Sequence, residues 1–175
     1  MRHLMTMLLC LLPALALGQS AVTVRGPAGA DGSDGADAPT THIATGHLSA
    51  TTTASTGTGK IGTGTAQSGT WAEDADTAAA FDAGTGTWTA PADGLYYVAL
   101  YTRSSTGLTQ ALIYVEGVQT LQGPYLGSGS SAAGALSLSS GDTVEFYVYH
   151  NSSATIFEDH ASTGYDTFYS IVGPL

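Results

Sequence analysis

Hydrophobic and polar residues alternate through the second half of the chain with the two-residue period of β-strands. The alternating segments are Thr109–Val115, Ala135–Leu138, Thr143–Tyr149 and Thr167–Val172. In the segment Leu95–Tyr101 every position is instead apolar or aromatic, which indicates a central strand covered on both faces by other strands or subunits. No stretch has sustained helical periodicity. Short strands separated by Gly-rich turns predict an all-β sandwich.

Residues 42–69 carry much weaker signals. Thr, Gly, Ser and Ala dominate this stretch, and Ile43, Leu48 and Ile61 are its few apolar anchors. We expect one or two weak strands within long loops there. Farther along the chain, loops that could meet a partner are expected at Ser104–Gly107, Gly123–Gly134 and Asn151–Thr163.

The N-terminal segment 1–18 has the composition of a secretion signal. A basic start precedes an apolar stretch, which ends in the small-x-small cleavage site Ala16-Leu17-Gly18. The apolar stretch is shorter than the about 20 residues that a membrane-spanning helix requires. We therefore expect a secreted or cell-surface protein with no membrane span, whose mature chain begins with a short arm over residues 19–25.

The only cysteine, Cys10, lies within this segment, so we expect a mature chain without disulfides. Small secreted domains often rely on disulfides, and this one must be stabilised by its core, a bound ion or oligomerisation. The chain has a formal net charge of −10 at pH 7. Such a charge argues against binding to nucleic acid or to anionic membranes, and it favours solubility.

Residues 26–39 contain four Gly-X-Y triplets whose glycines are Gly26, Gly29, Gly32 and Gly35. Three polyproline-II chains leave room at their common axis only for glycine, so the triplets predict a three-stranded collagen-like stalk. At roughly 3 Å rise per residue, this stalk would be too short to hold three chains together unaided, and the domain that follows would have to trimerise. The alternative is a flexible linker, because the run is rich in small and acidic residues.

The segment FDAGTGTWTAPADGLYYVAL, residues 81–100, resembles the signature of the globular head of complement component 1q and its tumour-necrosis-factor-like relatives. The matching positions are Gly86, Trp88, Pro91, Gly94, Leu95 and Tyr96. LSLSSGDTV at 136–144 resembles the later strand and Gly-Asp turn of that family, and residues 166–175 resemble its last strand more loosely. The resemblance covers a head domain over residues 40–175. The order of signal, stalk and head is also that of the family.

The resemblance implies a ten-stranded jelly-roll sandwich, three copies of which pack around an axis through an apolar, aromatic-rich face to form a homotrimer. Each tyrosine is assigned either to this face or to the core, because an aromatic ring with a polar tip suits both. Asp93-Gly94 and Gly141-Asp142 are expected to form tight turns. The predicted trimer or core residues are Phe81, Trp88, Pro91, Gly94, Tyr96, Tyr97, Gly141, Asp142, Phe146 and Phe168.

The sequence contains few candidate sites for catalysis, metal binding or modification. The histidines and serines form no specific catalytic pattern, and no phosphate-binding loop is present, so we expect no enzyme. No cofactor is required, although Glu73, Asp74 and Asp76 could supply oxygen ligands to calcium; the alternative is a solvated acidic loop. Asn151 begins the only glycosylation sequon, which would be used only in a eukaryotic source.

Two classes of function remain open. The first is a recognition or adhesion module, in which three heads display loops to an extracellular protein, glycan or matrix ligand and weak sites add through avidity. The second is a structural role as a subunit or trimerisation tip of a surface fibre or extracellular matrix. For the first, the expected partner-binding loop carries Phe157, Glu158, Asp159 and His160.

Overall fold

The computed structural model describes residues 40–50, 52–62, 67–105, 107–156 and 167–175. The predicted signal peptide, arm and Gly-X-Y stalk lie outside the described residues. The same is true of the loop residues Phe157, Glu158, Asp159 and His160. Everything described belongs to a compact unit that runs from Pro39 to Leu175. Within this part of the chain, no helix has the length and apolar character needed to cross a membrane.

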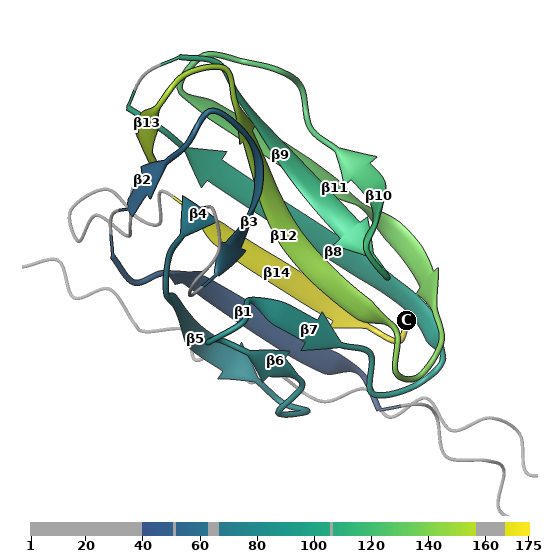
Figure 1. Ribbon diagram of the computed structural model, residues 1–175. Coiled ribbons are helices and arrows are strands. Elements are labelled where there is room, and N and C mark those ends of the chain that lie inside the picture. The colour runs from purple at the N-terminus through teal and green to yellow at the C-terminus, as the bar shows by residue number, and fades with distance from the viewer. Residues whose placement is uncertain (1–39, 51, 63–66, 106, 157–166) are drawn as a thin grey trace, which may run out of the picture. The chain divides into compact units, whose positions relative to one another are not determined.

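Two β-sheets stacked in layers form a jelly-roll sandwich, which confirms the predicted fold class (Figure 1). One sheet has the strand order β11 (Gly129–Leu138), β8 (Gly94–Arg103), β14 (Phe168–Gly173), β1 (His42–Leu48) and β5 (Trp71–Asp76). The other has the order β10 (Val118–Gln122), β9 (Thr109–Val115), β12 (Thr143–His150), β3 (Gly57–Gly62) and β4 (Gln67–Ser68), with β7 (Thr87–Thr89) also paired to β12 and to β6 (Phe81–Asp82).

Short segments supplement the ten strands that the resemblance implies. The segments β4 and β6 have two residues each, and β2 (Thr52–Ala54) pairs with β13 (Ala154–Ile156) as a separate two-stranded sheet. The pairings within the sheets are antiparallel except for that of β3 with β4, which is parallel. We call the layer around β8 the β8 sheet and the layer around β12 the β12 sheet.

The core lies between the two sheets and follows the alternation read from the sequence. Val144, Phe146 and Val148 of β12 are buried, as are Tyr96 and Val98 of β8. This period-two burial is what a strand with one covered face requires. The alternation predicted for β12 therefore corresponds to one buried and one outward face.

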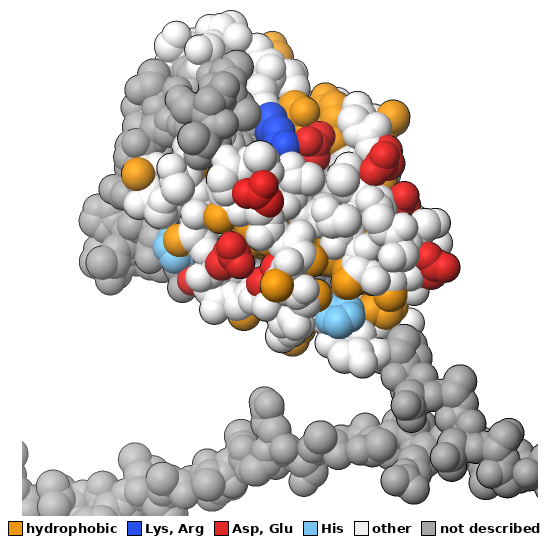
Figure 2. Space-filling view, turned by 60° about the horizontal axis from the view of Figure 1, so that its bottom comes forward, with side chains coloured by type: hydrophobic (Ala, Val, Ile, Leu, Met, Phe, Trp, Pro, Cys, Tyr) orange, Lys and Arg blue, Asp and Glu red, His pale blue; other side chains and the backbone are white. Residues whose placement is uncertain are grey.

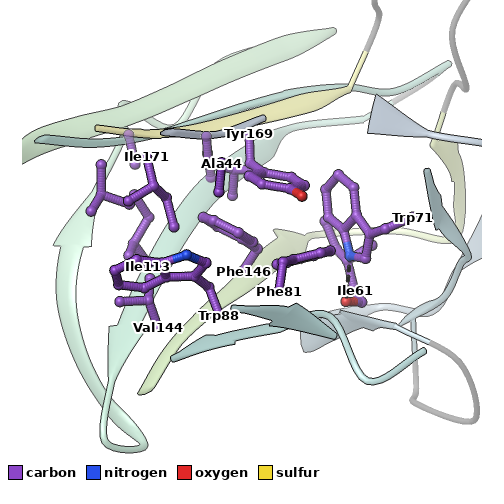
Figure 3. Close-up of a cluster of buried hydrophobic side chains, with 14 of the residues drawn as sticks. Ala44, Ile61, Trp71, Phe81, Trp88, Ile113, Val144, Phe146, Tyr169 and Ile171 are labelled. Carbon is purple, nitrogen blue, oxygen red and sulfur yellow. Dashed lines mark hydrogen bonds between the residues drawn. The ribbon is translucent and has the colours of Figure 1, made fainter. Parts of the chain in front are cut away.

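Aromatic rings fill one end of this core (Figure 3). The ring of Tyr169 lies 4.4 Å from that of Phe81, 5.0 Å from that of Phe146 and 5.3 Å from that of Trp71, measured between centroids. The Trp71 indole N–H donates to the carbonyl oxygen of Ile61 at 3.0 Å, so its polar group is satisfied inside the core. Such aromatic pairs each add about 0.5–1.5 kcal/mol beyond the burial of their area.

The stretch 42–69 contains more strand than the sequence predicts. It forms β1, β2, β3 and β4, and β1 lies inside the β8 sheet between β14 and β5. Gly46 of β1 leaves room for the aromatic core, because a Cβ atom there would lie 2.5 Å from the carbonyl oxygen of Ala72 and 2.6 Å from the ring of Tyr169. The small residues that weaken the sequence signal are thus the ones that allow close packing.

The prediction of a loop over residues 123–134 is wrong for residues 129–134, which form the first part of β11. β11 begins at Gly129 and pairs in register with β8, from Gly129 opposite Arg103 to Leu138 opposite Gly94. Its small residues fit a narrow place where the two sheets meet. A Cβ atom on Gly134 would lie 3.0 Å from the side chain of Leu121 in β10.

Candidate trimer interface

The outer face of the β8 sheet is apolar at its centre. β8 turns Tyr96, Val98 and Leu100 into the core, so Leu95 and Tyr97 point away from it and are 45% and 47% exposed. The expectation that both faces of this strand are covered is therefore met on one face only within a single protomer. The other face is available to a subunit.

Neighbouring strands extend this face sideways. Register pairing sets Tyr97 between Ala135 of β11 and Val172 of β14, and Val172 in turn pairs with Ile43 of β1. In another row, the rings of Tyr101 and Phe168 stack with centroids 5.6 Å apart. Four of the nine large hydrophobic residues that are exposed in the described part of the chain lie on this face: Ile43, Leu95, Tyr97 and Phe168. We call this surface the β8 face.

Charged groups lie at the border of the β8 face. Of the three neighbouring strands β11, β8 and β14, only β8 carries a charged residue, Arg103 at its end. Near the same end of the sheet, His47 of β1, which lies opposite Phe168, contacts Asp74 of β5 through Nδ1 and Oδ1 at 3.0 Å. An apolar centre with a charged rim has the anatomy of a protein interface, because few charges lose their hydration when it closes.

The structure separates the predicted trimer or core residues into three groups. Phe81, Trp88, Tyr96 and Phe146 are buried between the sheets. Tyr97 and Phe168 belong to the β8 face. The remaining members lie at two turns: Pro91 is in the turn before β8 and Gly94 is the first residue of β8, while Gly141 and Asp142 lie in the turn between β11 and β12.

These two turns contact each other. The Ala90 amide donates to the Asp142 carbonyl oxygen, and the Gly141 amide donates to the Ala90 carbonyl oxygen, both at 2.8 Å. The Ser140 amide donates to the Asp93 carboxylate at 2.7 Å. Gly94 is required by packing, because its φ is +156° and a Cβ atom there would lie 2.3 Å from Cβ of Pro174. The signature positions thus join two strand ends and the C-terminal segment.

The three calcium candidates occupy different settings along β5 and the turn after it. Asp76 accepts backbone N–H groups from Ala78, Ala80 and Phe81 at 3.1, 2.6 and 2.7 Å, while Asp74 contacts His47 and Glu73 is exposed. The expected acidic loop is therefore largely a strand. Among the described residues, no three His, Cys, Asp or Glu side chains are grouped closely enough to hold a metal ion. Calcium binding stays a prediction.

Asn151, the sequon residue, lies at the exposed start of the loop after β12. Its side-chain oxygen accepts the Leu108 amide at 2.9 Å, which ties this loop to the one before β9. Its glycosylation stays a prediction as well.

His150 is a buried residue that is not among the predicted site residues. This side chain is 1% exposed and follows Val144, Phe146 and Val148 on the inner face of β12, so the alternation of the strand already indicated it. Neither ring nitrogen has a hydrogen-bond partner among the described residues. Burial lowers the pKa of His150, because the charged ring would lose its hydration.

Comparisons with known proteins bear on the fold. No protein-family model and no curated protein matches the sequence. Among solved structures, murine APRIL at pH 8.0 matches with a TM-score of 0.54 and 13% identity, over 76% of this chain and 98% of that chain. Eiger TNF from S. frugiperda matches with a TM-score of 0.52 and 15% identity, over 77% of this chain and 92% of that one.

The globular domain of zebrafish complement 1qA protein also matches, with a TM-score of 0.50 and 14% identity, over 75% of this chain and 94% of that chain. At such identities the likeness establishes the fold alone. The described part of the chain has the jelly-roll fold of the complement 1q and TNF globular domains.

Proposed function

We propose that the protein is a secreted, non-enzymatic homotrimer whose globular heads bind extracellular partners. The observation that carries the proposal is the β8 face, where Leu95, Tyr97 and Phe168 are exposed together on a surface with a charged rim. Contiguous apolar patches of this kind mark protein interfaces on soluble proteins. A second and third copy of the same chain are the occupants that the sequence resemblance implies.

The ends of the chain support this arrangement. The first and last strands of the described unit pair, with His42 opposite Gly173, and the Thr41 hydroxyl donates to the Pro174 carbonyl oxygen at 3.3 Å. The Leu175 amide donates to the Leu95 carbonyl oxygen at 2.9 Å. The chain therefore enters the head beside the β8 face, where three closely packed heads would bring their preceding segments together.

The test is the mass of the protein in solution. A Tyr97→Asp variant places a charge at the centre of the β8 face, and burying an unpaired charge there would prevent association. We expect light scattering on a size-exclusion column to give about three times the protomer mass for the wild type and the protomer mass for Tyr97→Asp.

Val118→Asp provides the matched control, because Val118 is also exposed but belongs to β10 of the other sheet. This variant should keep the mass of the wild type. A wild-type protein of single-protomer mass would refute the trimer. Particles much larger than three chains would favour the fibre or matrix role instead.

A further inference from the structure

A second aromatic surface lies on the outer side of the β12 sheet. Tyr147 and Tyr149 point outward from β12, because the alternate residues Val148 and His150 are buried. Tyr114 points outward from the neighbouring strand β9. Side chains on the adjoining strand and segment complete the surface. We call it the tyrosine face, and its members are Tyr114, Tyr125, Tyr147, Tyr149, Gln110, Gln119 and Gln122.

The rings of this face form two neighbouring pairs. Tyr114 and Tyr147 stack with centroids 4.0 Å apart and planes inclined by 28°, and the ring centroids of Tyr125 and Tyr149 are 5.4 Å apart. Tyr147 and Tyr149 are two residues apart on β12, so the pairs follow one another along the strand at about 7 Å. Beneath them Leu112 is 2% exposed, although it does not belong to the core cluster. The rings are therefore supported from below.

Amide side chains border the rings. Gln119 lies opposite Tyr114 and Gln122 lies opposite Leu112 across the β10–β9 pair. The Gln119 amide donates to the Gln122 side-chain oxygen at 2.8 Å, and the Gln110 amide donates to the Gly123 carbonyl oxygen at the same distance. These contacts hold the amide groups in place while the side chains of Gln119 and Gln122 are exposed.

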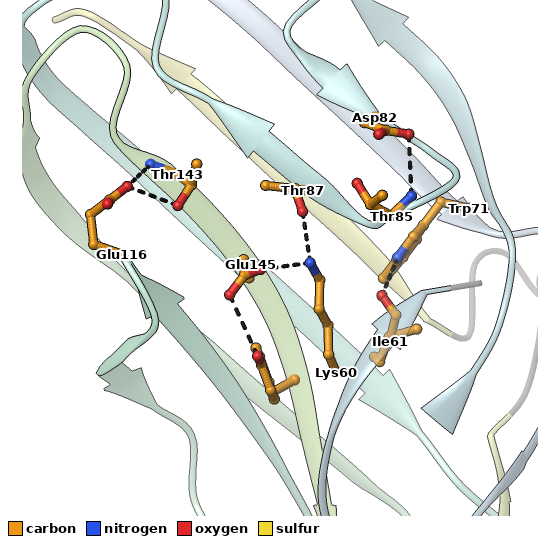
Figure 4. Close-up of polar contacts among 10 residues, drawn as sticks. Lys60, Ile61, Trp71, Asp82, Thr85, Thr87, Glu116, Thr143 and Glu145 are labelled. Atoms are coloured by element: carbon orange, nitrogen blue, oxygen red, sulfur yellow. Dashed lines mark hydrogen bonds and ion pairs between the residues drawn. The ribbon is translucent and has the colours of Figure 1, made fainter. Parts of the chain in front are cut away.

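The tyrosine face carries no net charge, although the chain carries −10. The charges beside it are Lys60 and Glu145, whose Nζ and Oε1 atoms are 2.6 Å apart, and Lys60 also donates to the Thr87 hydroxyl at 2.7 Å (Figure 4). Burial and the nearby Glu145 carboxylate raise the pKa of Tyr147, which keeps its phenol neutral. Elsewhere acidic side chains are dispersed over the surface, as Figure 2 shows for one side of the molecule.

These features select an uncharged ligand with flat apolar surfaces and many hydroxyl groups. The members of the face include no cation to bind a phosphate or sulfate, and a purely apolar ligand would not use the donors and acceptors of Gln119 and Gln122 that remain after their mutual hydrogen bond. Sugar rings offer C–H faces that stack on aromatic rings and hydroxyls that exchange hydrogen bonds with amides. We propose that the tyrosine face binds an uncharged polysaccharide, with successive sugar rings on the two tyrosine pairs and hydroxyls bonded to Gln119 and Gln122.

This inference deepens the proposed function, and it rests on that proposal only for the gain in avidity from three heads. All members of the face come from one protomer, on the sheet opposite to the β8 face. Trimer formation through the β8 face would therefore leave three tyrosine faces exposed on the outside of the assembly.

The test is binding of the protein, without its predicted signal peptide, to polysaccharides. Insoluble cellulose and chitin serve as uncharged probes, and calcium-free alginate beads crosslinked with barium serve as the anionic comparison. We expect saturable binding to at least one uncharged probe. Tyr147→Ala and Tyr125→Ala should each weaken it by roughly tenfold or more, the loss typical of truncating an aromatic side chain at the centre of a binding surface.

Tyr125 is 41% exposed, so its truncation leaves the fold intact even if Tyr147→Ala proves unstable in a thermal melt. Val118→Ala is the matched control, because Val118 is exposed on β10 and is not part of the tyrosine face. The proposal is overturned if neither uncharged probe binds, if alginate alone binds, or if Tyr125→Ala binds as well as the control. The mass of each sample, measured in parallel, tests the trimer separately, because a monomer that binds would refute only the trimer.

Discussion

His150 occupies a core position that the alternation of β12 reserves for an apolar side chain. Around it the core also contains hydroxyl groups that have no hydrogen-bond partner among the described residues, on Thr102, Ser104 and Thr109. Thr109 lies directly opposite His150 in the β9–β12 pair. This end of the sandwich is therefore more polar than the aromatic end, and it holds a neutral imidazole where a charge would be costly.

We predict that this residue makes the head sensitive to mild acid. The pKa of His150 in the folded protein is below that of an unfolded histidine, about 6.5, because burial disfavours the charged ring. The unfolded chain therefore binds the proton first, so the stabilisation is present above pH 6.5 and is lost as the pH falls through the folded pKa. Urea titrations at pH 7.5 and pH 5 should show a lower free energy of unfolding at pH 5.

Two carboxylates with lowered pKa values act in a different pH range from His150. Hydrogen bonds from Thr85 and Thr143 lower the pKa values of Asp82 and Glu116, so their contributions are lost only in stronger acid. A His150→Gln variant removes the titrating group and keeps a polar side chain of similar length. Its stability difference between the two pH values should be smaller than that of the wild type, and an equal difference would show that another group is responsible.

At the scale of elements, one carboxylate organises the turn that leaves β5. Asp76 accepts hydrogen bonds from three backbone N–H groups, and Phe81 at the end of this turn enters the aromatic core. The sequence suggested a metal ligand at this position, whereas the contacts within the chain give the same oxygens a structural role. A carboxylate can satisfy several turn amides at once because it has two oxygen acceptors.

We predict that Asp76→Ala destabilises the head by roughly 2–3 kcal/mol, because three N–H groups lose a charged acceptor and the turn that positions Phe81 loosens. Chemical denaturation followed by tryptophan fluorescence measures the loss, since Trp71 lies beside Phe81 with ring centroids 6.4 Å apart. Glu73→Ala is the control and should change the stability little, because Glu73 is exposed. If both variants have wild-type stability, the hydrogen bonds that Asp76 accepts do not stabilise the fold.

The sequence predicts strands with large apolar residues better than strands of small residues. β9, β12 and β14 are rich in large apolar and aromatic residues, and in β12 the buried apolar residues alternate with polar or tyrosine side chains, so its faces can be read directly from the chain. β11 consists of Gly, Ala and Ser apart from Leu136 and Leu138, and the only large aliphatic residues of β1 are Ile43 and Leu48, so both strands carry little periodic signal. These strands are fixed by backbone pairing with β14 and β8 and by close contact between sheets, and neither is a local property.

At the scale of the whole molecule, the central question is whether the head assembles without the Gly-X-Y triplets. The unit from Pro39 to Leu175 has its own core and both of its ends beside the β8 face. We predict that a shortened protein beginning at Thr40 keeps the mass of three chains in light scattering on a size-exclusion column. A single-chain mass for the shortened protein and a trimer for the full mature chain would assign assembly to the stalk instead.

The same measurement in a calcium chelator tests the remaining metal prediction. The contacts of Asp74 and Asp76 within the chain lead us to expect an unchanged mass. A trimer that falls apart only in chelator would instead assign the assembly to the acidic segment of β5.

The sequence by itself determined the all-β class, the two signature turns and the inner faces of the strongly alternating strands. Period and turn chemistry are local properties, so they are visible in one chain read in order. Only the tertiary structure decided which outward tyrosines share a surface. Tyr97 and Tyr101 are grouped with Phe168 on one sheet, and Tyr147 and Tyr149 with Tyr114 on the other, because strand pairing joins residues far apart in sequence. The separation of the β8 face from the tyrosine face is therefore a consequence of topology.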